Sequence, residues 1–584
     1  MTLVREHDWA PPSRADAALF QLKALAFRLE RLAHDALSGP RRLPRAEVVD
    51  FPHCVAVSRT PLWAEVTAPE RALQRGKVQN LRVAARHLDR TLLSPGAVFS
   101  FWRQLGRASR LRGFARGRML REGCIVPATG GGLCQLSNAL YDVALKAGCE
   151  IVERHAHSRR VPGSRAAQGR DATVAWNYVD LRFGSARPLL LRVRLDAREL
   201  IVELRAPDDD APRATVPSRG ACPPAAPRAV RGAPRADAES CETCDETACF
   251  RHGAAASEGR RAWLVDEFWP EFDAYIAAGK SERDLLCLPL DGKRWRRPQY
   301  GWTATGFGAV RTATLTTLGR ALRMRGSAQG PRRRMLELGA ADALARRFAA
   351  KLDAEVTELG VTQALLPMLW RDGHLGGRAF SVLMTRLPMA ALQARLDEAA
   401  RRHPERRTLG DFRADPALVA AESEALAAAA RIVTPHADIA ALFGERALLL
   451  DWQTPRLRFA HAPHSRRIAF AGPTIARKGA HEVRDAARAL GLEVVLMGSE
   501  LEGADFWRGV RTTRDIAGGV AAFVQPAVIE DKPRKLLAAL ASGIPVIATR
   551  ECGISPQEGL AFVAVNESAA LIDALRGVTS SSHR

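Results

Sequence analysis

The sequence contains no run of 18 consecutive apolar residues, although 47% of its 584 residues are hydrophobic. A helix needs about 20 apolar residues to cross a bilayer, so we expect no membrane-spanning segment. The N-terminal stretch MTLVREHDWAPPSRADAALFQL also lacks the apolar core that follows a basic start in secretory signals. We therefore expect a cytoplasmic protein that makes at most a peripheral contact with the inner membrane.

Cysteine is scarce as well, with ten residues in the whole chain. Disulfide frameworks are typical of short secreted chains that are dense in cysteine, whereas cytosolic thiols are kept reduced. The low count and the missing export signal together predict reduced thiols and exclude a disulfide scaffold.

Lysine is the rarest of the charged residues, because only nine of the 86 basic residues are lysine. The formal net charge is +22 and the isoelectric point about 10.4, values that taken alone suggest nucleic acid or an anionic membrane. The arginines are spread along the chain, however, and no RNA- or DNA-binding motif accompanies them. We expect no nucleic-acid partner.

The stretch from Gly130 to Phe183 carries most of the recognisable chemistry. Three glycines lead into Cys134, and the apolar residues behind it recur at helical spacing as far as Gly148. This pattern predicts a helix with Cys134 at its N-terminus. The positive end of a helix favours an anion, which lowers the pKa of a thiol placed there.

Two histidines and an aspartate follow the helix. EIVERHAHS (150–158) is predicted to be a strand that carries His155 and His157 on one face, and DATVAWNYVDLRF (171–183) a second strand that begins with Asp171. A cysteine nucleophile needs a base and a carboxylate that orients the base. We therefore hypothesise a triad of Cys134, either histidine and Asp171. The alternative is an unreactive, buried Cys134 beside a tight glycine turn.

Six motifs occur in a fixed order along residues 45–207, namely NLRVAA, SPGAVFSFW, GGGLCQLSN, ERHAHS, GRDATV and NYVDLRF. Through them this region resembles the VanW family, which is named after an accessory protein of glycopeptide-antibiotic resistance clusters. The resemblance implies an α+β domain but carries no reaction with it. The order of cysteine, histidine and aspartate also resembles the triad of transglutaminase-like cysteine enzymes.

Residues 1–44, which precede this domain, contain a predicted amphipathic helix at 14–38. Its apolar side is formed by leucines at helical spacing: Leu19, Leu22, Leu25, Leu29 and Leu32. We expect this side to pack on the neighbouring domain and not to lie on a membrane.

A Pro- and Ala-rich linker is predicted at 208–237, followed by a cysteine-rich segment at 238–261. The segment has the spacing C-x2-C-x4-C-x2-H, formed by Cys241, Cys244, Cys249 and His252. Thiolates at this spacing indicate zinc, or an Fe–S cluster with Cys222 or Cys287 as a further ligand. Unligated thiols in a loop are the alternative.

Helices and short apolar strands alternate from residue 262 to the C-terminus. The alternation predicts parallel sheets covered by helices, divided into one half at 262–460 and another at 461–584. Among the predicted strands of the first half are DLLCLPL (284–290), QALLPML (363–369) and FSVLMTRLP (380–388).

The last half resembles the donor-binding half of group 1 glycosyltransferases of the GT-B fold. The resemblance rests on RRIAFAGPTIARKGAHEVRDAARALGLEVVLMGSE (466–500) and VAAFVQPAVIEDKPRKLLAALASGIPVIATRECGI (520–554). It implies that the G-x5-K-G loop of Gly472, Lys478 and Gly479 binds the diphosphate of a nucleotide sugar, and that Glu530 contacts the donor sugar. A loop at a helix N-terminus suits phosphate, because its N–H groups are unpaired.

Two positions depart from the family pattern. The second acidic residue of the family falls on Ala538, and the basic residue after the first glycine falls on Pro473. A ribose contact and a phosphate contact are therefore missing.

The sequence thus predicts an α/β multidomain protein, with an α+β VanW-like domain followed by two doubly wound Rossmann-like halves of GT-B type. The leading hypothesis is a glycosyltransferase that uses a nucleotide sugar and a glycan or peptide acceptor in cell-envelope or secondary-metabolite synthesis. One alternative is a non-catalytic scaffold that binds a nucleotide or glycan. The other is a thiol hydrolase or amide-transfer activity at Cys134.

Overall fold

The structure is a computed structural model that describes residues 14–64, 68–121, 124–157, 169–208, 258–324, 331–410 and 413–579. It divides into two compact units. The first consists of Met1–Gly259 with Asp353–Thr357 and Leu375–Arg378, and the second of Arg260–Leu352, Glu358–His374 and Ala379–Arg584. Among the described residues, no helix combines the length and the apolar character that crossing a membrane requires.

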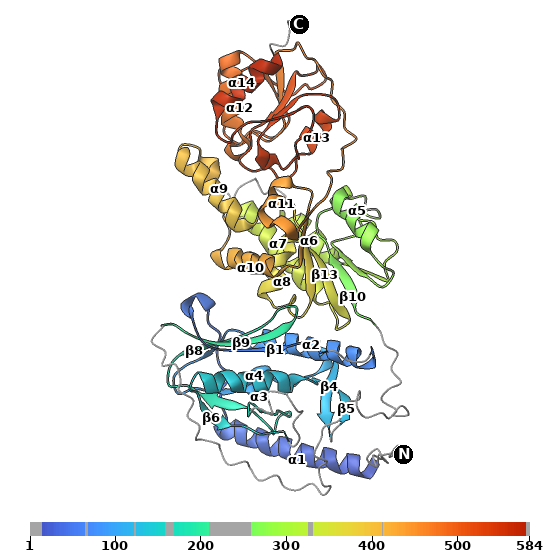
Figure 1. Ribbon diagram of the computed structural model, residues 1–584, viewed down its shortest axis with the longest axis vertical. Coiled ribbons are helices and arrows are strands. Elements are labelled where there is room, and N and C mark those ends of the chain that lie inside the picture. Colours follow the sequence, from blue (N-terminus) through green and yellow to red (C-terminus); the bar gives the residue numbers. More distant parts are fainter. Residues whose placement is uncertain are drawn as a thin grey trace, which may run out of the picture. The chain divides into compact units, whose positions relative to one another are not determined.

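The first unit is built on a four-stranded antiparallel sheet of order β1-β9-β8-β2, on which helices α2 and α4 pack (Figure 1). Its elements are β1 (His53–Pro61), α2 (Ala68–Leu88), β2 (Thr91–Leu93), α4 (Leu133–Lys146), β8 (Leu189–Leu195) and β9 (Glu199–Ala206). Smaller elements are α1 (Arg14–Ser38), β3 (Val98–Ser100), α3 (Phe101–Leu105), β4 (Arg116–Arg121), β5 (Cys124–Thr129), β6 (Glu150–Glu153) and β7 (Arg182–Gly184).

The predicted helix behind Cys134 is α4, and its apolar stripe forms part of the core of this unit. Leu136, Leu140, Val143 and Ala144 are completely buried, as expected for residues that recur every three or four positions on one helix face. The helical periodicity therefore predicted the inward face of α4 correctly.

The two strands predicted around the histidines were too long. Strand β6 ends at Glu153, so His155 and His157 lie beyond it, and residues 171–181 form an irregular segment before β7. Only isolated bridges, such as that between His155 and Thr173, continue the pairing. Alternating apolar and polar residues in such short runs indicate which face is buried. They do not indicate where the strand ends, because its length depends on pairing with a strand elsewhere in the chain.

The second unit contains two parallel sheets. The first has the order β12-β11-β10-β13-β14-β15-β16 and the second β19-β18-β17-β20-β21-β22. Numbered from the first strand of each sheet, both orders begin 3-2-1-4-5-6, the order of Rossmann folds, so the prediction of two doubly wound halves is confirmed.

The strands of the first sheet are β10 (Arg260–Leu264), β11 (Leu285–Leu288), β12 (Ala309–Thr312), β13 (Val356–Thr362), β14 (Ala379–Leu383), β15 (Arg431–Thr434) and β16 (Ala447–Leu449). Its helices are α5 (Pro270–Gly279), α6 (Thr314–Met324), α7 (Pro331–Ala349), α8 (Leu366–Arg371), α9 (Met389–Arg402), α10 (Pro416–Ala428) and α11 (Ala437–Phe443).

The second sheet consists of β17 (Arg467–Phe470), β18 (Glu493–Leu496), β19 (Thr512–Thr513), β20 (Ala522–Gln525), β21 (Val546–Ala548) and β22 (Leu560–Phe562). Its helices are α12 (Ala480–Leu490), α13 (Arg534–Leu540) and α14 (Ser568–Thr579). Helices α12 and α14 pack against each other (Figure 1).

One predicted strand of the first half is wrong. QALLPML (363–369) is a turn followed by helix α8, and the strand is the preceding segment, β13. A short apolar run fits a buried strand or a buried helix equally well. Pro367 lies in the first turn of α8. Proline is tolerated there, because the N–H groups of the first turn have no hydrogen-bond partner within the helix.

Candidate functional site

The glycine turn places Cys134 on the first turn of α4. Gly130 and Gly132 have φ values of 81° and 93°, a backbone conformation that residues other than glycine rarely adopt. Gly131 has no room for a side chain, since a Cβ there would lie 2.3 Å from the carbonyl oxygen of Gly117. The three glycines therefore allow the β4–β5 hairpin to run closely into the helix.

The thiol of Cys134 is hydrogen-bonded to the imidazole of His157, which is in turn bonded to Asp171. The backbone N–H of His157 donates to Asp171 Oδ2 at 2.8 Å, and ring atom Nδ1 meets Oδ1 of the same carboxylate. Nδ1 is thus occupied, and Nε2 is left for the thiol. Asp171 is 1% exposed, so the carboxylate is held in place away from bulk water.

The electrostatics of this trio favour a thiolate and an imidazolium. Burial opposes ionisation of Cys134, but the hydrogen bond and the charge of His157 outweigh it, so the pKa of the thiol is lowered. Burial likewise opposes the charged form of His157, yet Asp171 and Cys134 raise its pKa to about 10. This is the arrangement that activates a cysteine nucleophile.

Two side chains of α4 hold the segment that carries Asp171. Asn138 accepts a hydrogen bond at 2.7 Å from the backbone N–H of Ala172, and Ser137 donates to the carbonyl oxygen of the same residue. The hydroxyl of Thr173 then lies 3.6 Å from Cys134 Sγ. The sequence analysis missed these three positioning residues, although Ser137 and Asn138 belong to the GGGLCQLSN motif.

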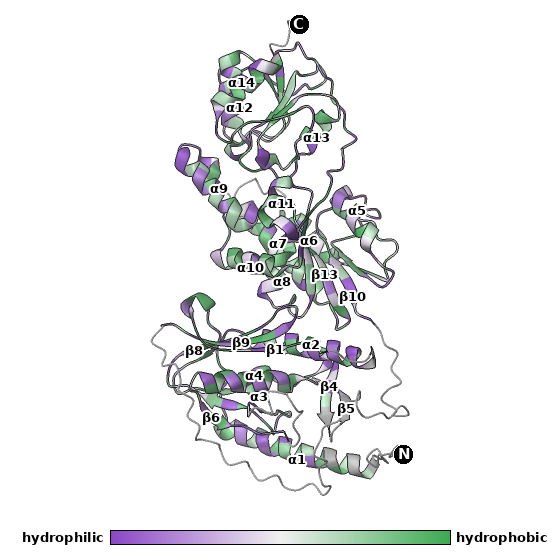
Figure 2. Ribbon diagram, viewed as in Figure 1, coloured by the Kyte–Doolittle hydropathy of each residue, from purple (hydrophilic) through white to green (hydrophobic). Residues whose placement is uncertain are grey.

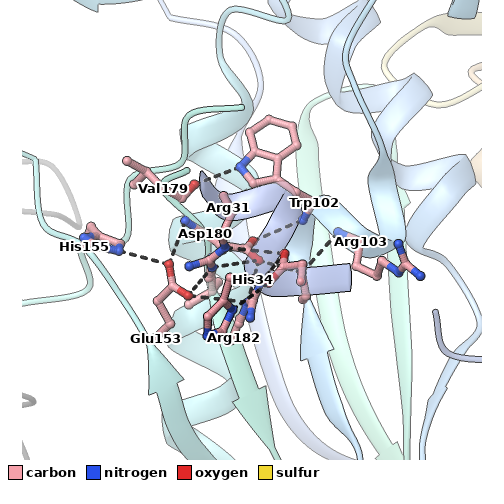
Figure 3. Close-up of polar contacts among 12 residues, drawn as sticks. Arg31, His34, Trp102, Arg103, Glu153, His155, Val179, Asp180 and Arg182 are labelled. Carbon is pink, nitrogen blue, oxygen red and sulfur yellow. Dashed lines mark hydrogen bonds and ion pairs between the residues drawn. The ribbon is translucent and has the colours of Figure 1, made fainter. Parts of the chain in front are cut away.

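His155 does not contribute to the thiol site. Its Nε2 lies 3.1 Å from Glu153 Oε1, and Glu153 belongs to a network of ion pairs with Arg31 and Arg182 (Figure 3). The structure therefore selects His157 from the two predicted histidines. The contact with the thiol comes from His157, whereas the ring of His155 is bound to Glu153, and the catalytic role of either histidine stays a prediction.

The predicted donor-loop residues come together beyond the carboxyl end of β17. Gly479 is the N-cap of α12 with φ 80°, and a Cβ there would lie 2.4 Å from the carbonyl oxygen of Pro526. Lys478 Nζ donates to the carbonyl oxygen of Ile529 at 2.8 Å and lies 3.2 Å from Glu530 Oε2. A Cβ on Gly472 would approach the Lys478 side chain to 3.2 Å, so the four residues share one site.

Glu530 is 8% exposed and firmly bound. Burial alone would raise the pKa of its carboxyl, but the ammonium of Lys478 overcomes that effect and the pKa is lowered. Oε1 accepts the backbone N–H of Lys532 at 2.9 Å, and Oε2 meets the amide of Gln525. Glu530 is therefore an anion beside the phosphate-type loop.

A second lysine approaches this loop. Lys535 Nζ donates to the carbonyl oxygens of Ala471 at 2.9 Å and of Met497 at 2.6 Å. Ala471, which this ammonium binds, lies two residues before Pro473, the residue that replaces the basic residue of the family pattern. Sequence spacing did not point to Lys535, because it lies on helix α13, more than 50 residues beyond the loop.

The first half of this unit contains a cavity of about 310 Å³ beyond the carboxyl ends of β10, β13 and β14. Asp266, Thr362 and Arg386, which follow or end these strands, contribute to its wall together with Trp269 and Tyr300. Burial, and then the neighbouring Glu267, raise the pKa of Asp266. The strand order reverses between β10 and β13, the point at which doubly wound sheets bind ligands.

The segment around Glu530 also contacts the first half. His436 Nε2 lies 2.8 Å from the carbonyl oxygen of Glu530, and Lys532 Nζ lies 2.6 Å from Glu267, the neighbour of Asp266. Arg534 pairs with Glu271 at 2.5 Å. The loop that carries Glu530 thus connects the two switch points.

The predicted metal ligands Cys241, Cys244, Cys249 and His252 lie outside the described residues, as does Cys222. In the part of the chain that is described, no group of three or more His, Cys, Asp or Glu side chains could hold a metal ion. Cys287 is buried in β11, and burial raises its pKa to about 12. Zinc or an Fe–S cluster in this segment stays a prediction.

Residues 76–205 match the family model described as VanW like protein. Over 212 residues the chain is 27% identical to the uncharacterized protein YoaR of Bacillus subtilis (strain 168), a match that spans 35% of this chain and 68% of YoaR. Over 135 residues it is 32% identical to the vancomycin B-type resistance protein VanW of Enterococcus faecalis (strain ATCC 700802 / V583), spanning 23% of this chain and 49% of that protein. The chain thus contains a VanW-like domain at residues 76–205.

Solved glycosyltransferases are structurally similar to this chain. For example, HepE from Anabaena in complex with UDP covers 56% of this chain and 91% of its own, with 12% identity and a TM-score of 0.32.

Proposed function

We propose that the VanW-like domain is a cysteine-dependent acyl-transfer enzyme that hydrolyses or transfers a peptide amide. The observation that carries this proposal is the chain of contacts from Cys134 through His157 to Asp171. A packing cysteine needs neither a bonded imidazole nor a buried carboxylate behind that imidazole. The lowered pKa of Cys134 increases the fraction of thiolate, which is the nucleophilic form.

The proposed reaction has two steps. The thiolate attacks the carbonyl carbon of the amide, the C–N bond breaks, and His157 donates its proton to the leaving amine as a thioester forms on Cys134. In the second step His157 accepts a proton from water or from a second amine, which attacks the thioester; the C–S bond breaks and Cys134 leaves as the thiolate. Asp171 holds the ring and stabilises its charged form throughout.

Alkylation by iodoacetamide tests the nucleophile without knowledge of the substrate. Cys134 should react faster at neutral pH than Cys149, whose pKa burial raises to about 12. His157→Ala should slow the reaction of Cys134, whereas the matched change His155→Ala should leave it unchanged. Equal reactivity of the two thiols would refute the nucleophile and leave the domain as a binding module.

A second function, glycosyl transfer from a nucleotide sugar, is supported by the polar groups at both switch points of the other unit. Lys478 and Lys535 supply cations next to the loop of Gly472 and Gly479, which suits a diphosphate. A glycan or peptide acceptor would occupy the cavity beside Asp266, whose carboxylate would accept the proton of the attacking hydroxyl. The C–O bond to the nucleotide breaks as the new glycosidic bond forms.

Calorimetric titration of the full chain with UDP-, GDP- and dTDP-sugars, followed by mass spectrometry of products, tests this function. Binding that is lost in Lys478→Ala supports the donor site, and a glycosylated product supports transfer. Binding of a nucleotide sugar without turnover would favour a non-catalytic scaffold, and the absence of binding would refute the donor site. We place both reactions in the cytoplasm, on cell-envelope or secondary-metabolite precursors, in keeping with the name of the VanW relative.

A further inference from the structure

Helix α1 presents its leucines to solvent and not to the domain beside it. Leu22, Leu25, Leu29 and Leu32 are 63%, 49%, 58% and 54% exposed. The expectation that this side packs on the domain is therefore wrong. A single exposed leucine is ordinary, but four on one side of one helix form the kind of apolar patch that marks an interaction surface.

The side of α1 opposite the leucines is held against the domain by hydrogen bonds and ion pairs. Arg28 Nε donates to the carbonyl oxygen of Trp176 at 3.0 Å, and Arg31 pairs with Glu153. Asp35 accepts two hydrogen bonds from Arg182, at 2.8 and 2.7 Å.

Among the described side chains of α1, the contacts with the domain are thus mainly polar, with Ala24 buried at 4% exposure and Phe27 stacked on Tyr178. Arg182 is itself buried and also bonds the buried Asp180 at 2.9 Å. Turning α1 to bury its leucines would remove Asp35 from Arg182, and breaking one member of a buried ionic network is costly. The leucines consequently stay outside. Figure 2 shows that hydrophilic and hydrophobic residues are mixed along α1.

The exposed side has the spacing of a coiled-coil seam. Its members alternate at intervals of four and three residues, namely Ala18, Leu22, Leu25, Leu29, Leu32 and Ala36. A run of apolar residues at the a and d positions of a heptad is typical of a helix that pairs with another helix. The small residues at both ends of the seam allow a close approach of two backbones.

The charge on α1 argues against a lipid surface as the partner. Helices that lie on anionic membranes carry an excess of Lys and Arg on the polar face. Helix α1 has four basic and three acidic residues, and two of the basic ones, Arg28 and Arg31, are bound to the domain. Little positive charge is left for lipid head groups.

We propose that α1 is a dimerisation helix whose leucine seam pairs with the same seam of a second copy of this chain. A two-fold axis matches the seam to itself, so no further complementarity is required. The six seam residues together expose on the order of 500 Å² per copy, and a pair that covered them fully would bury about 1,000 Å², the lower size of a specific interface.

Sedimentation equilibrium of the full chain at micromolar concentrations tests the proposal. The wild-type mass should be twice 63.6 kDa, and the double change Leu25→Glu with Leu29→Glu should return it to 63.6 kDa. Glutamate retains helix propensity, so circular dichroism should change little. The matched control is Leu37→Glu, because Leu37 lies on the same helix, is 90% exposed and falls outside the seam.

Each other outcome overturns the proposal. A wild-type monomer at every concentration, or a dimer that the double variant retains, would show that the seam does not join two copies. Cosedimentation of monomeric wild type with vesicles of phosphatidylglycerol, lost in the double variant, would assign the seam to a lipid surface instead. An unchanged alkylation rate of Cys134 would show that the variant domain is folded.

Discussion

The carboxylate of Asp171 binds His157 at two points, through the backbone N–H at 2.8 Å and through ring atom Nδ1. Two contacts to one residue fix the position of the imidazole and occupy Nδ1, which leaves Nε2 as the ring nitrogen for the hydrogen bond with Cys134. A change at Asp171 should therefore alter the reactivity of Cys134 through His157.

Asp171→Asn should slow alkylation of Cys134 at neutral pH by on the order of tenfold or more, the effect of one pKa unit on the thiolate fraction. The amide keeps the shape of the side chain but removes the charge that raises the pKa of His157. The rate of iodoacetamide reaction measures the change. A rate equal to that of wild type would mean that Asp171 only supports the fold.

The reactivity of Cys134 should level off at a lower pH than that of Cys149. The imidazole of His157 lowers the pKa of Cys134, and the pKa of His157 is itself raised to about 10, so the imidazolium that stabilises the thiolate persists up to about that pH. For Cys149, whose pKa is raised to about 12, the thiolate fraction should instead increase about tenfold per pH unit. Alkylation rates of both residues as a function of pH, read by peptide mass spectrometry, provide the comparison.

Lys478→Ala should weaken binding of a nucleoside diphosphate by about 1.5–3 kcal/mol, the worth of a hydrogen bond to a charged group. Lys535→Ala should weaken it as well if this lysine supplies the cation that Pro473 lacks. Lys280→Ala is the control, because its ammonium binds the carbonyl oxygen of Thr305 in the first half. Calorimetry of the three variants should separate the two donor-loop lysines from the control.

Asp266→Asn should abolish glycosyl transfer while it leaves nucleotide-sugar binding intact. The carboxylate lies in the acceptor cavity, and its raised pKa makes it a better base once it is ionised. Transfer by wild type should increase with pH as Asp266 loses its proton. Loss of donor binding together with activity would indicate a structural role for Asp266.

Arg406→Met should destabilise the second unit by roughly 3–5 kcal/mol. Arg406 Nη1 lies 2.5 Å from Glu482 Oε1, and both side chains are buried where a loop of the first half meets helix α12. Removal of the guanidinium leaves the Glu482 carboxylate buried without its cation. Denaturant unfolding followed by tryptophan fluorescence measures the loss, and Glu482→Gln combined with Arg406→Met should recover part of it.

Much of the thiol site could be predicted from local sequence. The glycines before Cys134 and the periodicity behind it predicted a helix that begins at the cysteine, because helix starts depend on a few adjacent residues. The same holds for Gly479 at the start of α12. The alternation of helices and short apolar strands likewise predicted the parallel sheets of the second unit, because each element is indicated by its own local pattern.

The choice between His155 and His157 depended on tertiary structure. The two residues are chemically equal and would share a face in a continuous strand, but the strand ends at Glu153. Glu153 then binds His155, and Asp171 binds His157. Asp171 lies 14 residues from His157 in the chain, and no local pattern encodes which carboxylate reaches which ring.

The sequence by itself determined that residues 14–38 form an amphipathic helix, since periodicity follows from the order of apolar residues alone. Only the tertiary structure decided which side of α1 faces the domain. Glu153 and Arg182 lie at that surface and form ion pairs with Arg31 and Asp35. Leucines in their place would leave these charges buried without a partner, which is costly. Burial depends on the surface that a helix meets, and that surface is assembled from residues more than 100 positions away.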